Sequence, residues 1–466
     1  MSRAEAVSRA ERYFDDGRFL ADLARRVAIP SSSQEPERAA ALYDYLADEI
    51  LPVLGRLGFA GRILDNPRGR QAPPVLVAER IENPQLVTVL LYGHGDTVAG
   101  MDDRWRAGLA PWRVAVEGER IYGRGTADNK GQHSVNIGAL DAVITERGAL
   151  GFNCKILIEM GEEVGSAGLR ELCAAQRDGA LKADLLIGSD GPRVSAAQPT
   201  LFLGARGGFP IELVVALREG SHHSGNWGGL LANPAIVLAH ALATITDARG
   251  AIRVPEWRPD LPRSVRQVLA GVAVDGGEDG PRIDEDWGEP GLTPAERVYG
   301  WNSFEVLAFV AGTPERPVNA IPGEARAFCQ LRYVVGTEVD DIVPALRRHL
   351  DRHGFPQVAV RAGRDTHFRA SRIDPADPWV AFAKLSLERT TGQSPTILPN
   401  LGGSLPNDIF TDILNLKTIW VPHSYPGCLQ HAPDEHFLAP VARQGLAIMA
   451  GLFWDLGDAA TPHPGR

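Results

Sequence analysis

The chain has 466 residues, of which 44% are hydrophobic and 23% are charged. This is ordinary globular usage, so a disordered or fibrous protein is excluded, and the length suggests about two or three domains. Lys and Arg number 48 and Asp and Glu number 58, which gives a net charge of −10. Because no basic cluster offsets this acidic balance, we expect neither nucleic acid nor an anionic membrane as a partner.

The sequence also predicts a compartment. Apolar runs such as 446–454 are much shorter than the roughly 18 to 20 residues of a membrane-spanning helix. The start, MSRAEAVSRAERYF, is charged where a secretory signal would be apolar. The cysteines show neither pairing nor CxxC spacing and lie at Cys154, Cys173, Cys329 and Cys428. We therefore expect a reducing, cytoplasmic location.

In chain order, the first 50 residues predict helices that are interrupted at Pro30 and the serines after it. Short β-branched runs and longer helical patterns then alternate. The predicted strands cover 75–78, 87–92, 154–159 and 184–187, and the predicted helices cover 132–145 and 167–175. This alternation predicts an α/β domain with a largely parallel sheet between helices.

After residue 208 the pattern becomes strand, helix, two strands, helix, strand, which predicts a ferredoxin-like α+β unit. Its elements are 209–217, 234–246, 304–310, 325–334, 339–352 and 358–361. The acidic, Gly-rich stretch 275–289 is interpreted as a solvated surface loop. The first pattern returns from residue 374, with a strand at 417–421. We therefore predict one domain from 1–207 and 373–466, interrupted by an inserted domain at 208–372.

Four motifs follow predicted strands or lead into a helix, where open α/β sheets bind ligands. They are Gly93–Thr97, Gly123–Gly131, Met160–Ser166 and Gly188–Gly191. Each alone has an ordinary structural explanation as a turn, a helix cap or surface acids. Together they gather carboxylates that repel one another unless a cation neutralises them.

One histidine and several carboxylates without cysteine favour a pair of divalent ions, zinc first, with manganese or cobalt as competitors. Asp128 is the candidate bridge, since one carboxylate can bind two metals through its two oxygens. Asp96 follows His94 by two residues in an extended segment, so it is expected to orient the imidazole. Adjacent Glu162 and Glu163 suggest that one binds metal and the other moves protons.

These motifs, together with 430–435, closely resemble in order and spacing the dinuclear-zinc metallopeptidases and amidohydrolases that include carnosinase, aminoacylase, acetylornithine deacetylase and succinyl-diaminopimelate desuccinylase. The resemblance covers almost the whole chain, and Asp190 looks most like the dipeptidase branch. It implies that one ion is held by His94, Asp128 and Asp190, and the other by Asp128, Glu163 and His431. It also implies Glu162 as the general base for a bridging hydroxide, Asp96 as the orienting carboxylate, and a cis peptide after Asp128.

The inserted segment carries a second part of the resemblance. His223, directly before Ser224-Gly225, matches a histidine that stabilises the oxyanion in the partner subunit's site. Asn319, in 318–322, matches a lid segment near the substrate. The resemblance therefore implies that 208–372 is a lid and dimerisation domain and that the protein is a homodimer.

One departure bears on the substrate. In the dipeptidase branch an arginine before the Gly-Gly-Ser loop binds the terminal carboxylate, whereas here Asn400 precedes Leu401 and the substrate-binding candidates Gly402, Gly403 and Ser404. Asparagine can donate a hydrogen bond but has no charge. Recognition of a free carboxylate is therefore in question, and an amidated or otherwise modified substrate is an alternative.

The sequence predicts hydrolysis of an amide bond in a small substrate, a dipeptide or an N-acyl amino acid. A deacylase or amidase for substrates without a free carboxylate stays open. A dinuclear phosphoesterase usually adds cations for phosphate, and the motifs here contain only Lys130 and Arg124. A non-catalytic metal-binding homologue would be expected to have lost its proton-moving residue, yet Glu162 and Asp96 are present.

Overall fold

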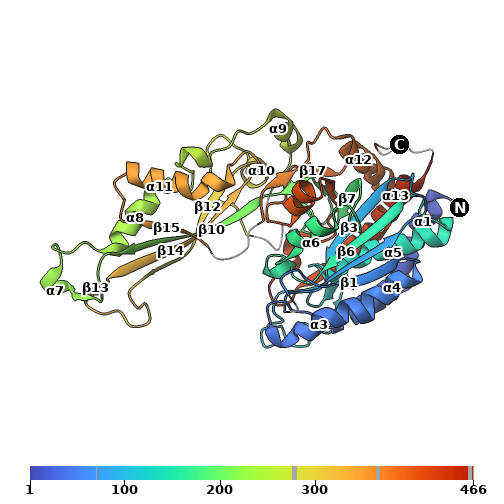
Figure 1. Ribbon diagram of the computed structural model, residues 1–466, viewed down its shortest axis with the longest axis horizontal. Coiled ribbons are helices and arrows are strands. Elements are labelled where there is room, and N and C mark those ends of the chain that lie inside the picture. The colour runs from blue at the N-terminus through green and yellow to red at the C-terminus, as the bar shows by residue number, and fades with distance from the viewer. Residues whose placement is uncertain (70, 275–280, 364–367, 460–463, 465–466) are drawn as a thin grey trace.

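A mixed eight-stranded sheet organises the larger of two bodies in the molecule (Figure 1). The computed structural model describes residues 1–69, 71–274, 281–363, 368–459 and 464. In spatial order the strands are β1 (Ala60–Leu64), β2 (Val75–Arg80), β6 (Asn153–Glu159), β3 (Thr88–His94), β7 (Leu185–Gly188), β18 (Lys417–Trp420), β8 (Thr200–Phe202) and β17 (Thr396–Leu398). The central strands β6, β3, β7 and β18 are parallel, as predicted, while β1 and β2 pair antiparallel at one edge.

Helices cover both faces of this sheet. On β3, Val89 and Leu91 enter one core cluster while Leu90 and Tyr92 enter the other, because successive side chains in a strand point to opposite faces. The first cluster is closed by α1 (Arg3–Asp15), α2 (Arg18–Ala28), α3 (Ala39–Asp44), η2 (Tyr45–Ile50), α4 (Leu51–Arg56), α5 (Lys130–Arg147), α12 (Pro378–Thr391) and α13 (Ala439–Gly457). The second cluster is closed by α6 (Leu169–Gln176), α9 (Arg263–Leu269), α10 (Pro294–Tyr299) and η6 (Ile409–Ile413).

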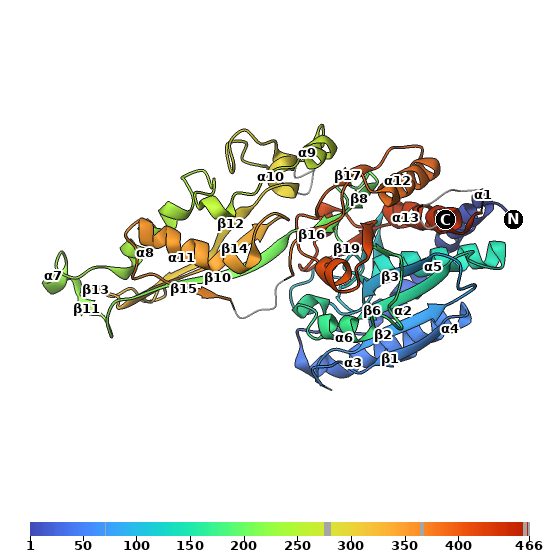
Figure 2. The same cartoon turned by 45° about the horizontal axis from the view of Figure 1, so that its top comes forward.

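The second body is elongated and contains a four-stranded antiparallel sheet (Figures 1 and 2). Its strands, in spatial order, are β12 (Ser303–Ala311), β14 (Glu324–Tyr333), β10 (Gly207–Ala216) and β15 (Ala359–Ala362). One face packs against α8 (Pro234–Ile245) and α11 (Ile342–Arg352). The predicted order of strand, helix, two strands, helix and strand is confirmed. Large apolar side chains stay exposed on β12 and β14, namely Val306, Leu307, Phe309, Val310 and Phe328.

Short elements connect and extend the two bodies. They are η1 (Pro36–Arg38), β4 (Ala115–Glu117), β5 (Arg120–Tyr122), η3 (Glu162–Val164), β9 (Gly204–Ala205), β11 (His222–His223), α7 (Ser224–Trp227), η4 (Pro255–Trp257), β13 (Ala320–Ile321), η5 (Val339–Asp341), β16 (Ser371–Arg372), η7 (Pro426–Cys428) and β19 (His436–Leu438). In both views α7, β11 and β13 lie at the end of the second body that points away from the large sheet (Figures 1 and 2). Within the described ranges, no helix combines the length and the apolar character needed to cross a bilayer.

The acidic stretch 275–289 was expected to be a solvated loop, and this is wrong for part of it. Residues 275–280 lie outside the described residues. Glu289 is buried, and its Oε1 pairs with the Arg258 guanidinium at 2.6 Å. The composition of this stretch could not predict the ion pair, because Arg258 lies 31 residues before Glu289 in the chain.

Candidate metal centre

Three neighbouring parallel strands bring predicted ligands to one edge of the large sheet. β3 ends at His94, and β7 ends two residues before Asp190. β6 leads into η3, which begins with Glu162 and Glu163. Since β6, β3 and β7 pair in parallel, their carboxyl ends meet at the same edge.

Asp128 and His431 reach this edge from loops. The peptide bond between Asp128 and Asn129 is cis, as the resemblance implies. Glu435 holds the loop in place, since its Oε1 accepts hydrogen bonds from the backbone N–H groups of Ala127 at 2.9 Å and Asp128 at 3.0 Å. His431 lies between η7 and β19.

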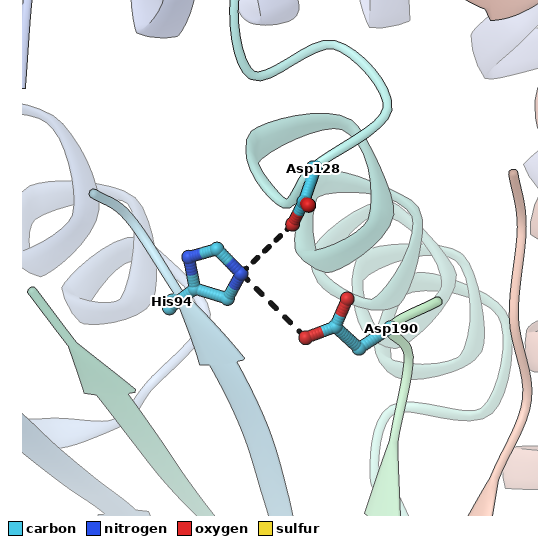
Figure 3. A group of neighbouring side chains, drawn as sticks. All are labelled: His94, Asp128 and Asp190. Atoms are coloured by element: carbon cyan, nitrogen blue, oxygen red, sulfur yellow. Dashed lines mark hydrogen bonds and ion pairs between the residues drawn. The ribbon is translucent and has the colours of Figure 1, made fainter. Parts of the chain in front are cut away.

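The five predicted ligands form two groups that share Asp128. His94 Nε2 lies 3.0 Å from Asp128 Oδ1 and 3.5 Å from Asp190 Oδ2 (Figure 3). His431 Nε2 lies 3.0 Å from Asp128 Oδ2 and 3.1 Å from Glu163 Oε2. Within each group the possible ligand atoms all lie within 4.8 Å of one another. Asp128 therefore presents one oxygen to each group.

The buried carboxylate of Asp190 is a second indication that the ligand groups fit a divalent cation. Asp190 Oδ2 is buried, and its contact with His94 Nε2 at 3.5 Å is too long for a strong hydrogen bond, so the described residues compensate its charge only in part. An unsatisfied buried carboxylate oxygen is costly unless a cation compensates it. Imidazole nitrogen with carboxylate oxygen is also a donor set that suits zinc and its neighbours among the divalent metals.

The carboxylates of the two ligand groups favour positive charge at the neighbouring histidines. Burial disfavours the charged form of His94, yet hydrogen bonds to Asp128, Asp190 and Asp96 raise its pKa well above the ordinary value. Hydrogen bonds to Asp128 and Glu163 raise the pKa of His431 to about 11. The carboxylates therefore favour positive charge at both imidazoles, and a bound cation would supply that charge in place of protons.

The two adjacent glutamates differ in their surroundings. Burial raises the pKa of Glu162 well above its usual range, and burial raises that of Glu163 to about 7. Glu163 belongs to the second ligand group, whereas Glu162 lines the cavity beside both groups. Because Glu163 belongs to a ligand group, Glu162 is the glutamate of the pair that is left free to move a proton.

Asp96 contacts both the His94 ring and the backbone of the two glutamates. Its Oδ1 lies 3.3 Å from His94 Nδ1, on the side of the ring opposite to the ligand nitrogen. Its carboxylate also accepts hydrogen bonds from the backbone N–H groups of Glu162 and Glu163, both at 3.2 Å. Ser33 Oγ donates a further hydrogen bond at 2.6 Å. The sequence had identified Ser33 only as part of a helix break, because its partner is distant in the chain.

A cavity of about 560 Å³ opens beside the ligands. Gly402, Gly403 and Ser404 line it, and Ser404 Oγ accepts a hydrogen bond from Arg332 Nη1 at 2.7 Å. Arg332, on β14 of the second body, also lines the cavity and was missed by sequence reasoning. Asn400 is buried outside the cavity lining and donates to the Tyr299 carbonyl oxygen at 2.8 Å. β14 thus contributes a cation to the cavity wall, and Arg193 is a second arginine that lines it.

Arg124 and Lys130, the two basic residues of the motifs, bind other groups of the protein and not the cavity. Arg124 Nη1 pairs with Glu435 at 2.8 Å in the buried interior. Lys130 Nζ donates to the carbonyl oxygens of Arg26 and Ile29, at 3.0 and 2.6 Å. Burial lowers the pKa of Lys130 to about 7. Neither side chain lines the cavity beside the ligands.

The remaining predicted site residues, His223 and Asn319, lie at the far end of the second body. His223 pairs with Ala320 between β11 and β13, and the Asn319 carbonyl oxygen accepts a hydrogen bond from Ser224 N–H at 2.9 Å. Both views place this end far from the large sheet (Figures 1 and 2). A single chain therefore does not bring them to the ligand groups.

Glu159, at the end of β6, gives a testable pH dependence. It is buried and accepts hydrogen bonds from Tyr92 Oη and Ser166 Oγ, both at 2.9 Å. Burial raises its pKa from 4.5 to about 7. Since the folded state then binds this proton more tightly than the unfolded state, the folded state loses stability as pH rises from about 4.5 to about 7. We expect Glu159→Gln, which keeps an oxygen acceptor, to remove this loss.

The measurement is urea unfolding of chelator-treated protein at about pH 5 and about pH 8. At the higher pH the variant should gain about 3 kcal/mol over the wild type, and at the lower pH much less. An equal difference at both pH values would show that Glu159 is ionised throughout.

Comparisons with known proteins show the family of this chain. The profile of peptidase family M20/M25/M40 matches residues 90–455, a range that contains both ligand groups. The chain is 30% identical to a beta-Ala-His dipeptidase of Mus musculus, over 96% of this chain and 94% of that relative.

Two solved structures share the fold. Human carnosine dipeptidase 1 matches with a TM-score of 0.77 and 23% identity, over 97% of this chain and 99% of that one. The dipeptidase Dug1p from Saccharomyces cerevisiae matches with a TM-score of 0.80 and 21% identity, over 99% and 100%. The predicted class of a mixed α/β domain with a second α+β body is thereby confirmed.

Proposed function

Because the chain belongs to peptidase family M20/M25/M40, whose members are metal-dependent hydrolases, we propose that it cleaves the amide bond of dipeptides with two divalent ions, zinc first and manganese or cobalt as alternatives. The observation that carries this proposal is the pair of ligand groups that share Asp128 beside a cavity of about 560 Å³. In the proposal His94, Asp128 and Asp190 hold one ion, and Asp128, Glu163 and His431 hold the other.

Bound divalent ions make water more acidic and polarise a carbonyl oxygen. The chain's own residues supply the remaining chemistry. Glu162 takes the proton of the attacking water as the carbonyl carbon is attacked, and returns it to the departing amine. Asp96 orients the His94 ring through Nδ1. Arg332 and Ser404 receive the substrate's terminal carboxylate at the other side of the cavity.

Arg332 gives a prediction about the substrate. We expect Arg332→Gln to raise KM for a dipeptide about tenfold to hundredfold, because it removes a charge-assisted contact with the carboxylate. The C-terminal amide of the same dipeptide should show little change. The measurement compares kcat and KM for both substrates. Arg326→Gln is the matched control, since Arg326 lies on the same strand and pairs with Glu324 outside the cavity.

An equal effect of Arg332→Gln on the dipeptide and its amide would favour the alternative raised by Asn400, a deacylase or amidase that does not read a free carboxylate.

We further propose a homodimer in which 208–372 is the lid and dimerisation domain and His223 completes the partner's site. The exposed apolar side chains of β12 and β14 support a protein interface on this body. β11, which ends at His223, lies far from the large sheet of its own chain (Figure 2), and this supports action across subunits.

Subunit mixing tests this arrangement. We expect His223→Ala to lower kcat about a hundredfold, as loss of one oxyanion donor does. Mixing it with an inactive Glu162→Gln protein and allowing exchange should restore about a quarter of wild-type activity, because random pairing in a symmetric dimer rebuilds that fraction of complete sites. No recovery after verified exchange, or a monomer in sedimentation, would contradict the proposal.

A substrate panel separates the remaining candidates. Metal-loaded protein is assayed with dipeptides, N-acetyl and N-succinyl amino acids, amides and a phosphate ester. Dipeptides should be cleaved fastest. Turnover of the phosphate ester alone would favour a phosphoesterase, which the engaged side chains of Arg124 and Lys130 argue against. Metal binding without any turnover would favour a non-catalytic homologue.

The four buried, unpaired cysteines support the proposed cytoplasmic location.

A further inference from the structure

A second cavity, of about 500 Å³, lies where the start of β12 meets α10, beside Arg206 just before β10. Among its described lining residues are Arg206, Trp287, Trp301 and Glu305, and it shares only Val298 with the cavity beside the metal ligands. Figure 2 shows α10 and the first parts of β10 and β12 at this junction of the two bodies. Its volume lies in the range of small-molecule sites.

Arg206 gives this cavity a buried positive charge. The residue is 8% exposed, and its Nε donates to the Gly402 carbonyl oxygen at 2.8 Å. Within the described part of the chain, no carboxylate lies within ion-pair distance of its guanidinium. Burial, together with the charge of Arg332, lowers its pKa to about 10. Nε is bonded to Gly402, and since Arg206 lines the cavity, the other guanidinium N–H groups are available to an anionic group of a ligand there.

Glu305, on β12, gives the same cavity a negative charge at its solvent-exposed side. Burial raises its pKa, while the charge of Arg206 acts in the opposite direction. The charge of each residue therefore shifts the pKa of the other, although the two side chains form no ion pair. A ligand that carries both an anion and a cation would meet both charges in this cavity.

The other charged groups of this cavity are engaged or lie at its rim. Arg297 donates to the carbonyl oxygens of Glu285, Trp287 and Glu289, which fixes the loop that forms one wall. The Glu289 carboxylate pairs with Arg258 at 2.6 Å. The side chains at the exposed rim are Arg282, Asp284 and Glu285. Arg206 is therefore the buried charge that remains for a ligand, and Glu305 is the exposed carboxylate whose charge acts on it.

Two tryptophans supply an aromatic wall. Trp287 is 53% exposed. Trp301 has a buried Nε1 that finds no acceptor in the described residues. A large apolar or aromatic group would cover Trp287, and an acceptor on the ligand would satisfy the Trp301 indole N–H.

We propose that this second cavity binds a free amino acid with a large apolar or aromatic side chain as its zwitterion, with the carboxylate on Arg206, the ammonium on Glu305 and the side chain against Trp287 and Trp301. The bound carboxylate would lie on the far side of Gly402 from the proposed substrate, because Arg206 Nε is bonded to the Gly402 oxygen. Occupancy would thereby act on the loop that lines the cavity beside the metal ligands.

The test uses zinc-loaded, full-length protein and 5-fluoro-L-tryptophan observed by fluorine NMR. We expect saturable binding that Glu305→Gln weakens at least about tenfold, because it removes the charge that faces the ammonium. Tryptamine, which lacks the carboxylate, and indole-3-propionate, which lacks the ammonium, should compete at least about tenfold more weakly than L-tryptophan. Glu315→Gln is the matched control, since exposed Glu315 lies in the same body outside the cavity.

Binding to the cavity beside the metal ligands is distinguished by Arg332→Gln, which should leave the affinity for 5-fluoro-L-tryptophan unchanged. Three results would overturn the proposal: no saturable binding at millimolar ligand, equal competition by the two truncated analogues, or loss of binding in Arg332→Gln with none in Glu305→Gln. The analogue series on wild-type protein, read together with Arg332→Gln, decides the question even where Glu305→Gln fails to fold.

Discussion

Glu162→Gln is expected to lower kcat by about a hundredfold to ten-thousandfold, the range that a general acid–base residue contributes. Glu162 lines the cavity but belongs to neither ligand group, and burial raises its pKa. Glutamine keeps the shape of the side chain and cannot carry the proton between water and leaving amine. KM and the amount of bound metal should therefore stay near wild-type values. The measurements are steady-state kinetics and metal content after gel filtration.

The neighbouring residue provides the matched control. Glu163→Gln changes a ligand instead of a base, since Glu163 Oε2 lies 3.1 Å from His431 Nε2. It should lose metal together with activity. Near-normal activity in Glu162→Gln would show that the assigned base is wrong, and loss of metal from it would show that the two glutamates have exchanged roles.

Asp128→Ala is expected to have the largest effect on metal binding. Asp128 is the one residue common to both ligand groups, with Oδ1 facing His94 and Oδ2 facing His431. Even the outer partners of ligands are worth about 10-fold to 100-fold in metal affinity, so loss of a shared ligand should weaken binding more than a hundredfold. Competition with a chromophoric chelator measures the affinity, and activity should fall below detection.

Asp190→Ala is the informative comparison, because Asp190 belongs to one group only. It should weaken one ion and leave the second near its wild-type affinity. If Asp128→Ala and Asp190→Ala lost the same amount of metal, Asp128 would not be shared between two ions.

Much of the site could be predicted from local sequence. A strand that ends in a polar motif is a short-range signal, and adjacent parallel strands bring their carboxyl ends together. His94, Asp190 and the glutamate pair were therefore placed at one sheet edge without coordinates. The cis peptide after Asp128 came from the family resemblance, since no local pattern encodes it.

Long-range partners could not be predicted in this way. Arg332 lies on a strand with alternating burial, so its sequence context is that of an ordinary polar position. Its role in the cavity depends on Ser404, which is 72 residues away. Ser33 likewise has no local signal, because Asp96 is 63 residues away. Pairing of this kind is decided by packing between elements.

The inserted segment shows the same limit. Its strand and helix order was visible in the periodicity, yet α9 and α10 pack on the larger body, in a core cluster with Leu90 and Trp420. The acidic composition of 275–289 predicted solvation, while buried Glu289 pairs with Arg258. Composition reports an average over a stretch, and a single buried ion pair within it is invisible to that average.

The central claim is that distant side chains converge into two cation sites with a common carboxylate. Anomalous diffraction at the zinc absorption edge, on crystals grown with zinc, tests it most directly. We predict two peaks, one among His94, Asp128 and Asp190 and the other among Asp128, Glu163 and His431. A single peak, or peaks away from Asp128, would contradict it.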